Sequence, residues 1–455
     1  MKTKQEYTVD IHDLTHMGEG IAKIDGFPVF IPGVLPGERA LIRIRQVKKN
    51  FGFGNLIRII HESPQRVDPP CLVYPACGGC QIMHASYAGQ MTFKQKRVKD
   101  SIERIGGITF PVKPVLGMAH PWRYRNKSQF PVGMSGNRPI IGFYQKGSHA
   151  IVDTNECLIQ PSVMDKGLQV VRKYLADHTI SIYDEKTGKG LFRHVIFREG
   201  TATGQVMVIV VLNGNKLPGQ ERLFNELKKA IPGFCSLVIN ENRKKTNVIM
   251  GPTCHTVHGS SYFEDRIFDL TFRISPHAFF QINHRQTEVL YDQVLQLAHL
   301  QGDETVLDLY CGIGTISLLL AKHCKQVIGI ETVKEAIEDA QWNARNNELN
   351  HAVFMTGAVE KLLPQFAREG KKIDVIVVDP PRKGCDPAVL DAIVQMKPAR
   401  LVYVSCNPAT LARDMKILTQ KGFHVGVIQP VDMFCHSSHV ECVVLMSSSK
   451  KKDPI

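Results

Sequence analysis

A cysteine follows a short apolar run near the end of the 455-residue chain. Residues 401–404, Leu-Val-Tyr-Val, predict a buried strand, and Ser405-Cys406-Asn407-Pro408 ends it because proline cannot donate to a strand ladder. A helix is expected from Thr410 to Gln420. Open α/β sheets bind their ligands at the carboxyl ends of the strands. Cys406 is therefore either a small buried residue or a reactive thiol at a binding edge, and its neighbours decide between the two.

A glycine turn precedes this strand by about a hundred residues. Thr305–Tyr310 predicts a strand, Cys311-Gly312-Ile313-Gly314 a turn and Thr315–His323 a helix, and the next strand, Val327–Glu331, ends in an acid. This is a nucleotide-binding βαβ pattern, in which glycines let the backbone approach a ligand and the acid binds ribose hydroxyls. The turn is one glycine short of the dinucleotide fingerprint. It favours S-adenosylmethionine over NAD, because no pyrophosphate has to be bound.

Two more strand ends carry polar groups. The buried strand Ile373–Val378 runs into Asp379-Pro380-Pro381-Arg382, and the segment Val431–Glu441 leads into a last strand, Cys442–Met446. The carboxyl ends of parallel strands meet at one edge of a sheet. We therefore expect a cofactor, a carboxylate and a thiol around one crevice.

The N-terminal part predicts a small barrel. Residues 7–60 contain four or five runs of alternating apolar and polar residues separated by glycine and proline. One stretch adds cations and an aromatic ring suited to nucleic acid, namely Arg43, Arg45, Lys48, Lys49 and Phe51. The pattern resembles the TRAM domain of RNA-modifying enzymes.

Four cysteines suggest a metal centre. Cys71, Cys77 and Cys80 form a C-x5-C-x2-C cluster with two glycines, and Cys157 is the best available fourth ligand. Four thiolates suit tetrahedral zinc or an iron–sulfur cluster. The five-residue gap is longer than zinc knuckles use, which favours iron–sulfur. The spacing is not the C-x3-C-x2-C of radical S-adenosylmethionine enzymes.

The segments between these motifs are less specific. Ser86–Ile105 has helical spacing, and its Lys94, Lys96, Arg97 and Lys99 are interpreted as a solvated face. Trp122–Lys127 packs three cations and two aromatic residues into six positions, which suits RNA. Residues 128–272 predict an α+β region with one helix near Gln220–Ala230.

Composition fits a globular protein with a polyanionic partner. The net charge is +13, and no apolar run reaches the roughly 18 residues of a membrane span. The N-terminus lacks the apolar core of a signal peptide. We expect a cytoplasmic protein, without membrane contact, whose twelve cysteines are reduced.

Taken together, the motifs resemble the S-adenosylmethionine-dependent RNA 5-methyluridine methyltransferases. The resemblance rests on residues 279–283 (Phe-Phe-Gln-Ile-Asn), 308–314, 379–382, 405–414 and 439–441, and with the barrel and cysteines it spans nearly the whole chain. It implies an α/β fold: a Rossmann-like class I methyltransferase domain (85–119 and 273–455), an OB-like TRAM barrel (1–62) and a central α+β domain (63–84 and 120–272). The four cysteines are typical of the ribosomal-RNA branch, which implies a 4Fe–4S cluster on Cys71, Cys77, Cys80 and Cys157.

The resemblance also implies roles for individual residues. Cys406 would be the nucleophile, Glu441 the base, and Asp379 would orient the uracil or cofactor. The S-adenosylmethionine set would be Gln281, Asp308, Tyr310, Gly312, Gly314, Thr315, Glu331 and Asp379. The chain departs from the family pattern at Thr315, where asparagine is common, and at Ala358, where a polar side chain often meets the adenine.

The expected function is methylation of C5 in one or two uridines of 23S ribosomal RNA by a monomeric enzyme. Uracil C5 is a poor nucleophile until a thiolate adds at C6, and C6 is accessible only in an unpaired or flipped base. The alternatives are the same chemistry on transfer RNA and a non-catalytic RNA-binding assembly factor. A cytosine-5 enzyme would place a cysteine after Pro381, and an amino-group methyltransferase an aromatic residue, but this chain has Arg382.

Overall fold

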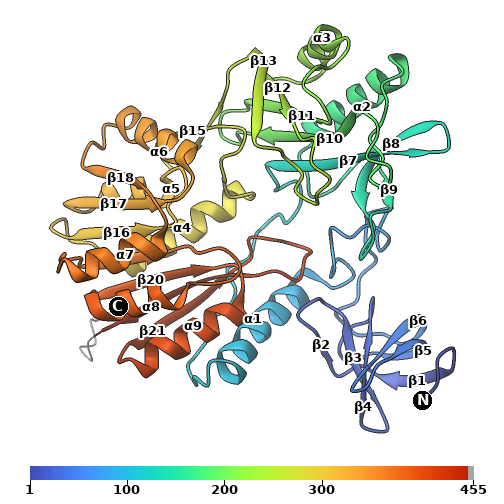
Figure 1. Cartoon of the computed structure of the whole chain (residues 1–455). Helices are drawn as coiled ribbons and strands as arrows, with labels where there is room; N and C mark the ends of the chain where they lie inside the picture. Colours follow the sequence, from blue (N-terminus) through green and yellow to red (C-terminus); the bar gives the residue numbers. More distant parts are fainter. Residues whose placement is uncertain (449–455) are drawn as a thin grey trace.

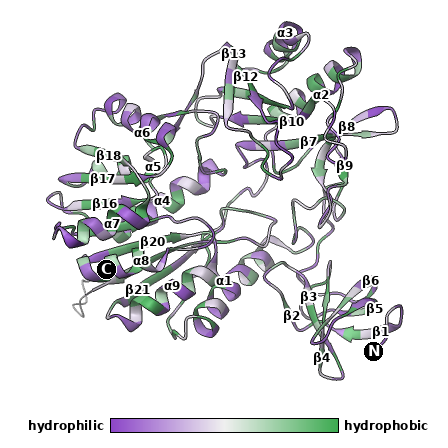
Figure 2. Ribbon diagram, in the orientation of Figure 1, coloured by the Kyte–Doolittle hydropathy of each residue, from purple (hydrophilic) through white to green (hydrophobic). Residues whose placement is uncertain are grey.

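The computed structural model describes residues 1–448, so residues 449–455, the end of the expected catalytic domain, lie outside the described part. Figure 1 shows an N-terminal, a central and a C-terminal sheet in separate regions of the molecule. In Figure 2 the strands of the C-terminal sheet are mostly hydrophobic, and the helices that cover them present polar residues outward. Among the described residues no helix is long and apolar enough to cross a membrane.

The N-terminal sheet is six-stranded and mostly antiparallel, in the order β1-β5-β6-β4-β3-β2. Alternating side chains of these strands form one apolar core around Val9, Val29 and Ile42, which explains the period-two sequence pattern. The strands are β1 (Glu6–Asp10), β2 (Asp13–Leu14), β3 (Gly20–Ile24), β4 (Phe27–Ile31), β5 (Arg39–Val47) and β6 (Gly52–His61).

The central sheet has seven strands in the order β13-β12-β11-β10-β7-β8-β9, with α2 and α3 packed on one face. Its elements are β7 (Lys127–Ser135), β8 (Arg138–Tyr144), β9 (Ile151–Asp153), α2 (Ser162–Asp177), β10 (Phe192–Glu199), β11 (Val206–Leu212), α3 (Gln220–Ala230), β12 (Phe234–Glu241) and β13 (Thr253–Gly259). The prediction of a single helix was wrong, because α2 was missed. Its buried Met164, Leu168, Val171 and Leu175 recur at helical spacing, a signal that the sequence did contain.

A hairpin and a helix connect this region to the C-terminal sheet. They are β14 (Phe263–Ile267), β15 (Leu270–Ile274) and α4 (His284–Ala298), and the core of the C-terminal sheet continues through all three. Arg198 of β10, fully buried, donates to the carbonyls of Ser275 and Pro276 at 2.8 and 3.0 Å. This contact joins the central sheet to the segment that carries Gln281.

The C-terminal sheet has the order β18-β17-β16-β19-β20-β22-β21. Strands β16 to β20 are parallel and β22 is antiparallel to both its neighbours. The elements are β16 (Thr305–Leu309), α5 (Thr315–Ala321), β17 (Gln326–Glu331), α6 (Lys334–Asn346), β18 (Ala352–Thr356), α7 (Val359–Arg368), β19 (Val375–Val378), α8 (Pro387–Met396), β20 (Arg400–Ser405), α9 (Pro408–Gln420), β21 (His424–Val431) and β22 (Glu441–Ser447). The predicted strand, turn and helix around Cys406 are confirmed.

Helix α1 (Tyr87–Arg104) belongs spatially to the C-terminal sheet, although it precedes the central one in sequence. Its buried face, including Val98 and Ile102, packs into the core that α9 covers. Lys94 on this face is fully buried and paired with Asp432, and Arg97 donates to the Ser438 carbonyl. The interpretation of these two cations as solvated was therefore wrong.

Candidate active site

Three predicted catalytic residues lie at adjacent strand ends. Cys406 follows β20 and Asp379 follows β19, the parallel neighbour of β20. Because β22 runs antiparallel, its first residue lies at the same edge: Ser405 pairs with Cys442, which places Glu441 beside Cys406. The loops after β19 and β20 are joined, since Asn407 Nδ2 and Thr410 Oγ1 donate to the Arg382 carbonyl at 3.1 and 3.2 Å.

The three acids are crowded and poorly solvated. Burial raises the pKa of Cys406 to about 11, and the nearby Glu441 and Asp379 add to this, whereas Arg382 opposes it. Burial raises the pKa of Asp379 to about 6. The pKa of Glu441 lies well above its usual value because of burial first and Asp379 second. The upward shifts of the two carboxyl groups are typical of groups that exchange protons near neutral pH, whereas the shift of Cys406 favours its neutral thiol.

A pocket beside these groups contains most of the predicted cofactor residues. Its lining includes Gln281, Asp308, Tyr310, Gly312, Thr315 and Asp379. Gly312, with φ of 56°, has nothing within 4 Å of where a Cβ would stand, so its backbone is open to a ligand. Asp308 is buried, and its Oδ1 has no hydrogen-bond partner. An open glycine turn above an orphaned carboxylate fits a nucleoside ligand.

The other two predicted cofactor residues border the pocket. Gly314 is the N-cap of α5, with φ of 82°. Glu331 Oε2 accepts from the Gly312 backbone N–H at 3.3 Å, so it lies next to the turn. Thr315 Oγ1 bonds to the Tyr291 hydroxyl at 3.0 Å, and Ala358 is the N-cap of α7. The structure thus gathers the predicted set around one turn.

The four predicted metal ligands also come together. Cys71, Cys77, Cys80 and Cys157 line one cavity of about 480 Å³, and all twelve cysteines are free. Within residues 1–448 no group of three or more His, Cys, Asp or Glu side chains is arranged to hold a single metal ion. Zinc–sulfur bonds of about 2.3 Å would require closely convergent thiols, whereas a multi-iron cluster separates its ligands.

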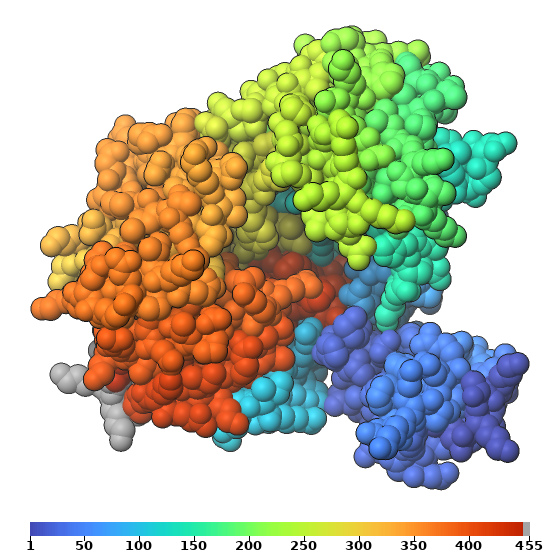
Figure 3. All heavy atoms as spheres, in the orientation of Figure 1, coloured from blue at the N-terminus to red at the C-terminus, as the bar shows by residue number. Residues whose placement is uncertain are grey.

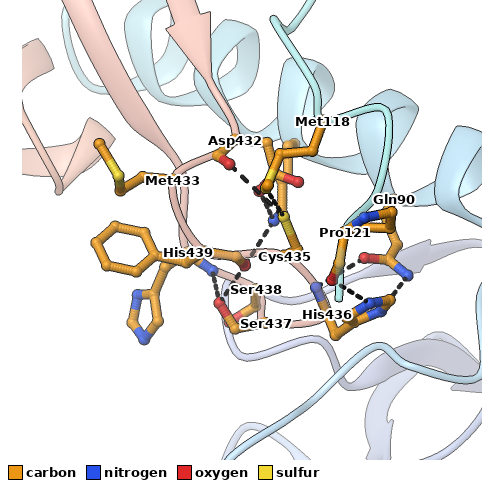
Figure 4. A network of polar contacts seen from close by, with 12 residues as sticks. Gln90, Met118, Pro121, Asp432, Met433, Cys435, His436, Ser437, Ser438 and His439 are labelled. Carbon is orange, nitrogen blue, oxygen red and sulfur yellow. Dashed lines mark hydrogen bonds and ion pairs between the residues drawn. The ribbon is translucent and has the colours of Figure 1, made fainter. Parts of the chain in front are cut away.

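The sequence did not predict the side-chain contacts that hold the loop before Glu441 in place. Lys94 Nζ pairs with Asp432, and Tyr87 Oη donates to the same carboxylate at 2.7 Å. Figure 4 shows the next contacts, in which His436 lies between Gln90 and the Pro121 carbonyl. Its ring stacks on Trp122 at 4.0 Å. No local pattern announces these contacts, since their partners are more than 300 residues apart.

Comparisons with known proteins agree with this geometry. Residues 2–57 match the TRAM domain, and residues 239–449 match the family described as tRNA (Uracil-5-)-methyltransferase. An uncharacterized RNA methyltransferase of Bacillus cereus is 49% identical over 97% of this chain and 96% of its own length. Another, from Halalkalibacterium halodurans, is 50% identical over 96% of each chain.

The chain belongs to the RNA uracil-5-methyltransferase family. A solved structure, Pyrococcus abyssi tRNA (uracil-54, C5)-methyltransferase with S-adenosyl-L-homocysteine, matches with a TM-score of 0.77 and 28% identity. The match covers 96% of this chain and 99% of the other. This RNA methyltransferase therefore has a methyltransferase fold and an N-terminal TRAM domain, as expected from its motifs.

Proposed function

We propose that the enzyme methylates C5 of one or two uridines in 23S ribosomal RNA. The observation that carries the reaction is the meeting of Cys406, Asp379 and Glu441 at adjacent strand ends beside the glycine-turn pocket. The choice of ribosomal RNA rests on the four gathered cysteines. Transfer RNA is the second candidate, because the solved relative from Pyrococcus abyssi is a transfer-RNA enzyme.

The residues divide the reaction into addition and elimination. Cys406 Sγ bonds to uracil C6, and the electrons of the C5–C6 double bond move toward O4, which leaves C5 nucleophilic. S-adenosylmethionine supplies the electrophilic methyl group that C5 takes. Glu441 then removes the proton from C5, the double bond reforms, and the C6–S bond breaks to return the Cys406 thiolate. Asp379 orients the uracil or cofactor between them.

The electrostatics suit this order of events. Arg382 favours the thiolate of Cys406, whereas the two carboxylates disfavour it. A base whose pKa is raised by burial holds an abstracted proton well near neutral pH, and Glu441 is such a group. The Cys406 thiol therefore stays protonated until substrate arrives, and Glu441 readily accepts the proton that leaves uracil C5.

Two substitutions test the reaction. Cys406→Ala should give no methyl transfer from labelled S-adenosylmethionine to ribosomal RNA taken from a strain that lacks the enzyme. Glu441→Gln should differ in kind and accumulate methylated RNA covalently bound to protein, because elimination fails. Cys235→Ala, at a half-buried thiol on β12, is the matched control and should turn over normally. Normal turnover by Cys406→Ala would refute the mechanism, and mass mapping of ribosomal and transfer RNA from the deletion strain identifies the substrate.

We also propose a 4Fe–4S cluster on Cys71, Cys77, Cys80 and Cys157 in a cytoplasmic, monomeric enzyme. The donor set fits, because each of four irons takes one thiolate and these four thiols line a single cavity. The role assigned to the cluster is structural, since the methyl donor already drives the reaction. Protein purified without oxygen should be brown and contain about four irons and four sulfides per chain. Stoichiometric zinc without acid-labile sulfide would contradict this assignment.

A further inference from the structure

The cavity that contains the four cysteines is also lined by cations and rings from three regions of the chain, namely Arg125, Lys127, Arg382, Phe434 and His439. The part of the cavity that these five residues line is called its basic end. Figure 3 shows that the molecule is hollowed between the central and C-terminal regions. This end of the cavity has no role in the mechanism above.

Arg382 joins the cavity to the reacting groups. Its backbone carbonyl is held by Asn407 and Thr410, on either side of the turn into α9. Its charge acts on the Cys406 thiol on one side and on the His439 imidazole on the other. A uridine placed against Cys406 therefore has this end of the cavity next to it.

The cations of the cavity are not neutralised by the protein. Within residues 1–448 neither Arg125 nor Lys127 nor Arg382 forms an ion pair with a carboxylate. Arg123, two positions before Arg125, shows the opposite: it pairs with Glu156 and with Asp165, the latter at 2.5 Å. Burial and the positive charges of Arg198 and Arg125 lower the pKa of Lys127 to about 7. An anion at this place would relieve the repulsion.

Two aromatic rings face the same space. Phe434 and His439 lie with centroids 5.9 Å apart and ring planes at 70°. In Figure 4 the His439 ring points away from the contacts around Cys435 and His436, which hold the loop from behind. Both rings are half-buried, so they keep an open face. Rings beside unpaired cations are the features that proteins use to bind single-stranded nucleic acid.

We infer that this end of the cavity binds the RNA nucleotide adjoining the flipped uridine, with Arg125 and Lys127 on its phosphate and the Phe434–His439 pair against its base. The inference rests on the proposed function and adds a subsite to it. A flipped base leaves its neighbour unstacked on one side, and the ring pair replaces the lost stack. Arg382, between the subsite and Cys406, holds the backbone that links the two nucleotides.

A second explanation would account for the same cations. Arg125 lies close enough to Cys80 for its charge to favour the thiolate, so Arg125 and Lys127 could serve only to neutralise an iron–sulfur cluster. The two explanations differ in what the loss of the cations changes. If the cations serve only the cluster, their removal should lower the cluster content, and RNA affinity should fall only in molecules that have lost the cluster. If the cations bind RNA, their removal should lower RNA affinity also in molecules that retain their iron and sulfide.

The test uses the full-length protein and unmodified ribosomal RNA from a strain that lacks the enzyme. Arg125→Gln/Lys127→Met should lower RNA affinity at least tenfold in low salt. The slope of log affinity against log salt should fall by about 0.7 per removed contact, or about 1.4 in all. Lys127→Arg, in place of Lys127→Met, should restore most of the RNA affinity and salt slope that the loss of Lys127 removes, because arginine keeps the positive charge. Lys216→Gln, at an exposed lysine outside the cavity, is the matched control and should retain affinity and slope.

A second variant tests the ring pair. Phe434→Leu should weaken RNA binding roughly tenfold without changing the salt slope, because a stack carries no charge. S-adenosylmethionine affinity should be unchanged in every variant. Unchanged RNA affinity and slope in Arg125→Gln/Lys127→Met, or a loss confined to cluster-free molecules, would overturn the subsite. Failure of the proposed function looks different, because then the wild-type enzyme itself would not methylate this RNA.

Discussion

Asp308 lines the pocket that is proposed to bind the cofactor, and one of its carboxylate oxygens accepts from Ser317 at 2.5 Å while the other has no donor. Burial raises its pKa to about 7, and the charges of Asp379 and Glu331 add to the effect. The folded protein thus retains a proton on this group that the unfolded chain releases near pH 4. Burial of this carboxyl group therefore opposes folding at any pH at which the unfolded chain would ionise it.

Asp308→Asn should therefore stabilise the free enzyme at alkaline pH. A folded-state pKa above the unfolded value means that stability declines as pH rises from about 4 to about 7, and that the loss is complete above this window. The variant lacks this decline, so its melting temperature should exceed that of the wild type at pH 8 and approach it at pH 5. S-adenosylmethionine affinity should fall. Asp303→Asn, at an exposed carboxylate before β16, should change neither, and equal wild-type and Asp308→Asn melting temperatures at pH 8 would refute the argument.

The elements that carry the active site were predictable where a strand is a short apolar run. Strand β20 and the turn before α9 were found because Val-Tyr-Val and Asn-Pro are strong local signals. The meeting of Cys406 with Asp379 followed from the geometry of parallel strands, which share one carboxyl edge. The burial of Lys94 was not predictable, because its partner lies 338 residues away and a lysine on a helix is usually solvated. Helix α2 was missed although its apolar spacing was present.

The packing of α1 against the loop before Glu441 depends on a wholly buried ion pair. Lys94→Met leaves Asp432 charged and unpaired, which should cost about 3–5 kcal/mol of unfolding free energy. Adding Asp432→Asn removes that charge and keeps an acceptor for Tyr87, so the double variant should recover more than half of the loss. Urea unfolding measures both. Lys99→Met, at an exposed position of the same helix, should cost little, and a double variant no more stable than Lys94→Met would contradict this view.

On the scale of the whole molecule, three ion pairs between described residues connect the barrel to the rest of the protein. Glu19 pairs with Lys146 at 3.2 Å, Asp13 with Lys96 at 2.7 Å, and the buried Glu38 with Arg66 at 2.5 Å. These contacts hold the barrel at the side of the molecule shown in Figure 3. Of its predicted RNA-binding cations, Arg43 already pairs with Glu6 at 2.7 Å. Arg45, Lys48 and Lys49 remain near the turn between β5 and β6.

Removing these three charges should weaken RNA binding without affecting the cofactor. Arg45→Gln/Lys48→Gln/Lys49→Gln should lower the salt slope by about 2 if each cation contacts one phosphate. S-adenosylmethionine affinity should not change, because every proposed cofactor residue belongs to the C-terminal α/β region or to the segment before it. The measurement is RNA affinity at several salt concentrations beside a cofactor titration. Arg39→Gln, at an exposed cation of β5, is the control. An unaltered salt slope in the triple variant would show that these three cations do not contact RNA phosphates.

The pairing of Lys94 with Asp432 also determines when helix α1 can complete its packing during translation. The two residues are 338 positions apart, and at about 5–20 residues per second Lys94 is synthesised roughly 20–70 s before Asp432. During that interval α1 presents its apolar face and a lysine whose only carboxylate partner among the described residues does not yet exist. Cys406, the proposed nucleophile, is likewise made before Glu441, the proposed base. A nascent chain therefore cannot complete either its core or the proposed catalytic site until β22 has been translated.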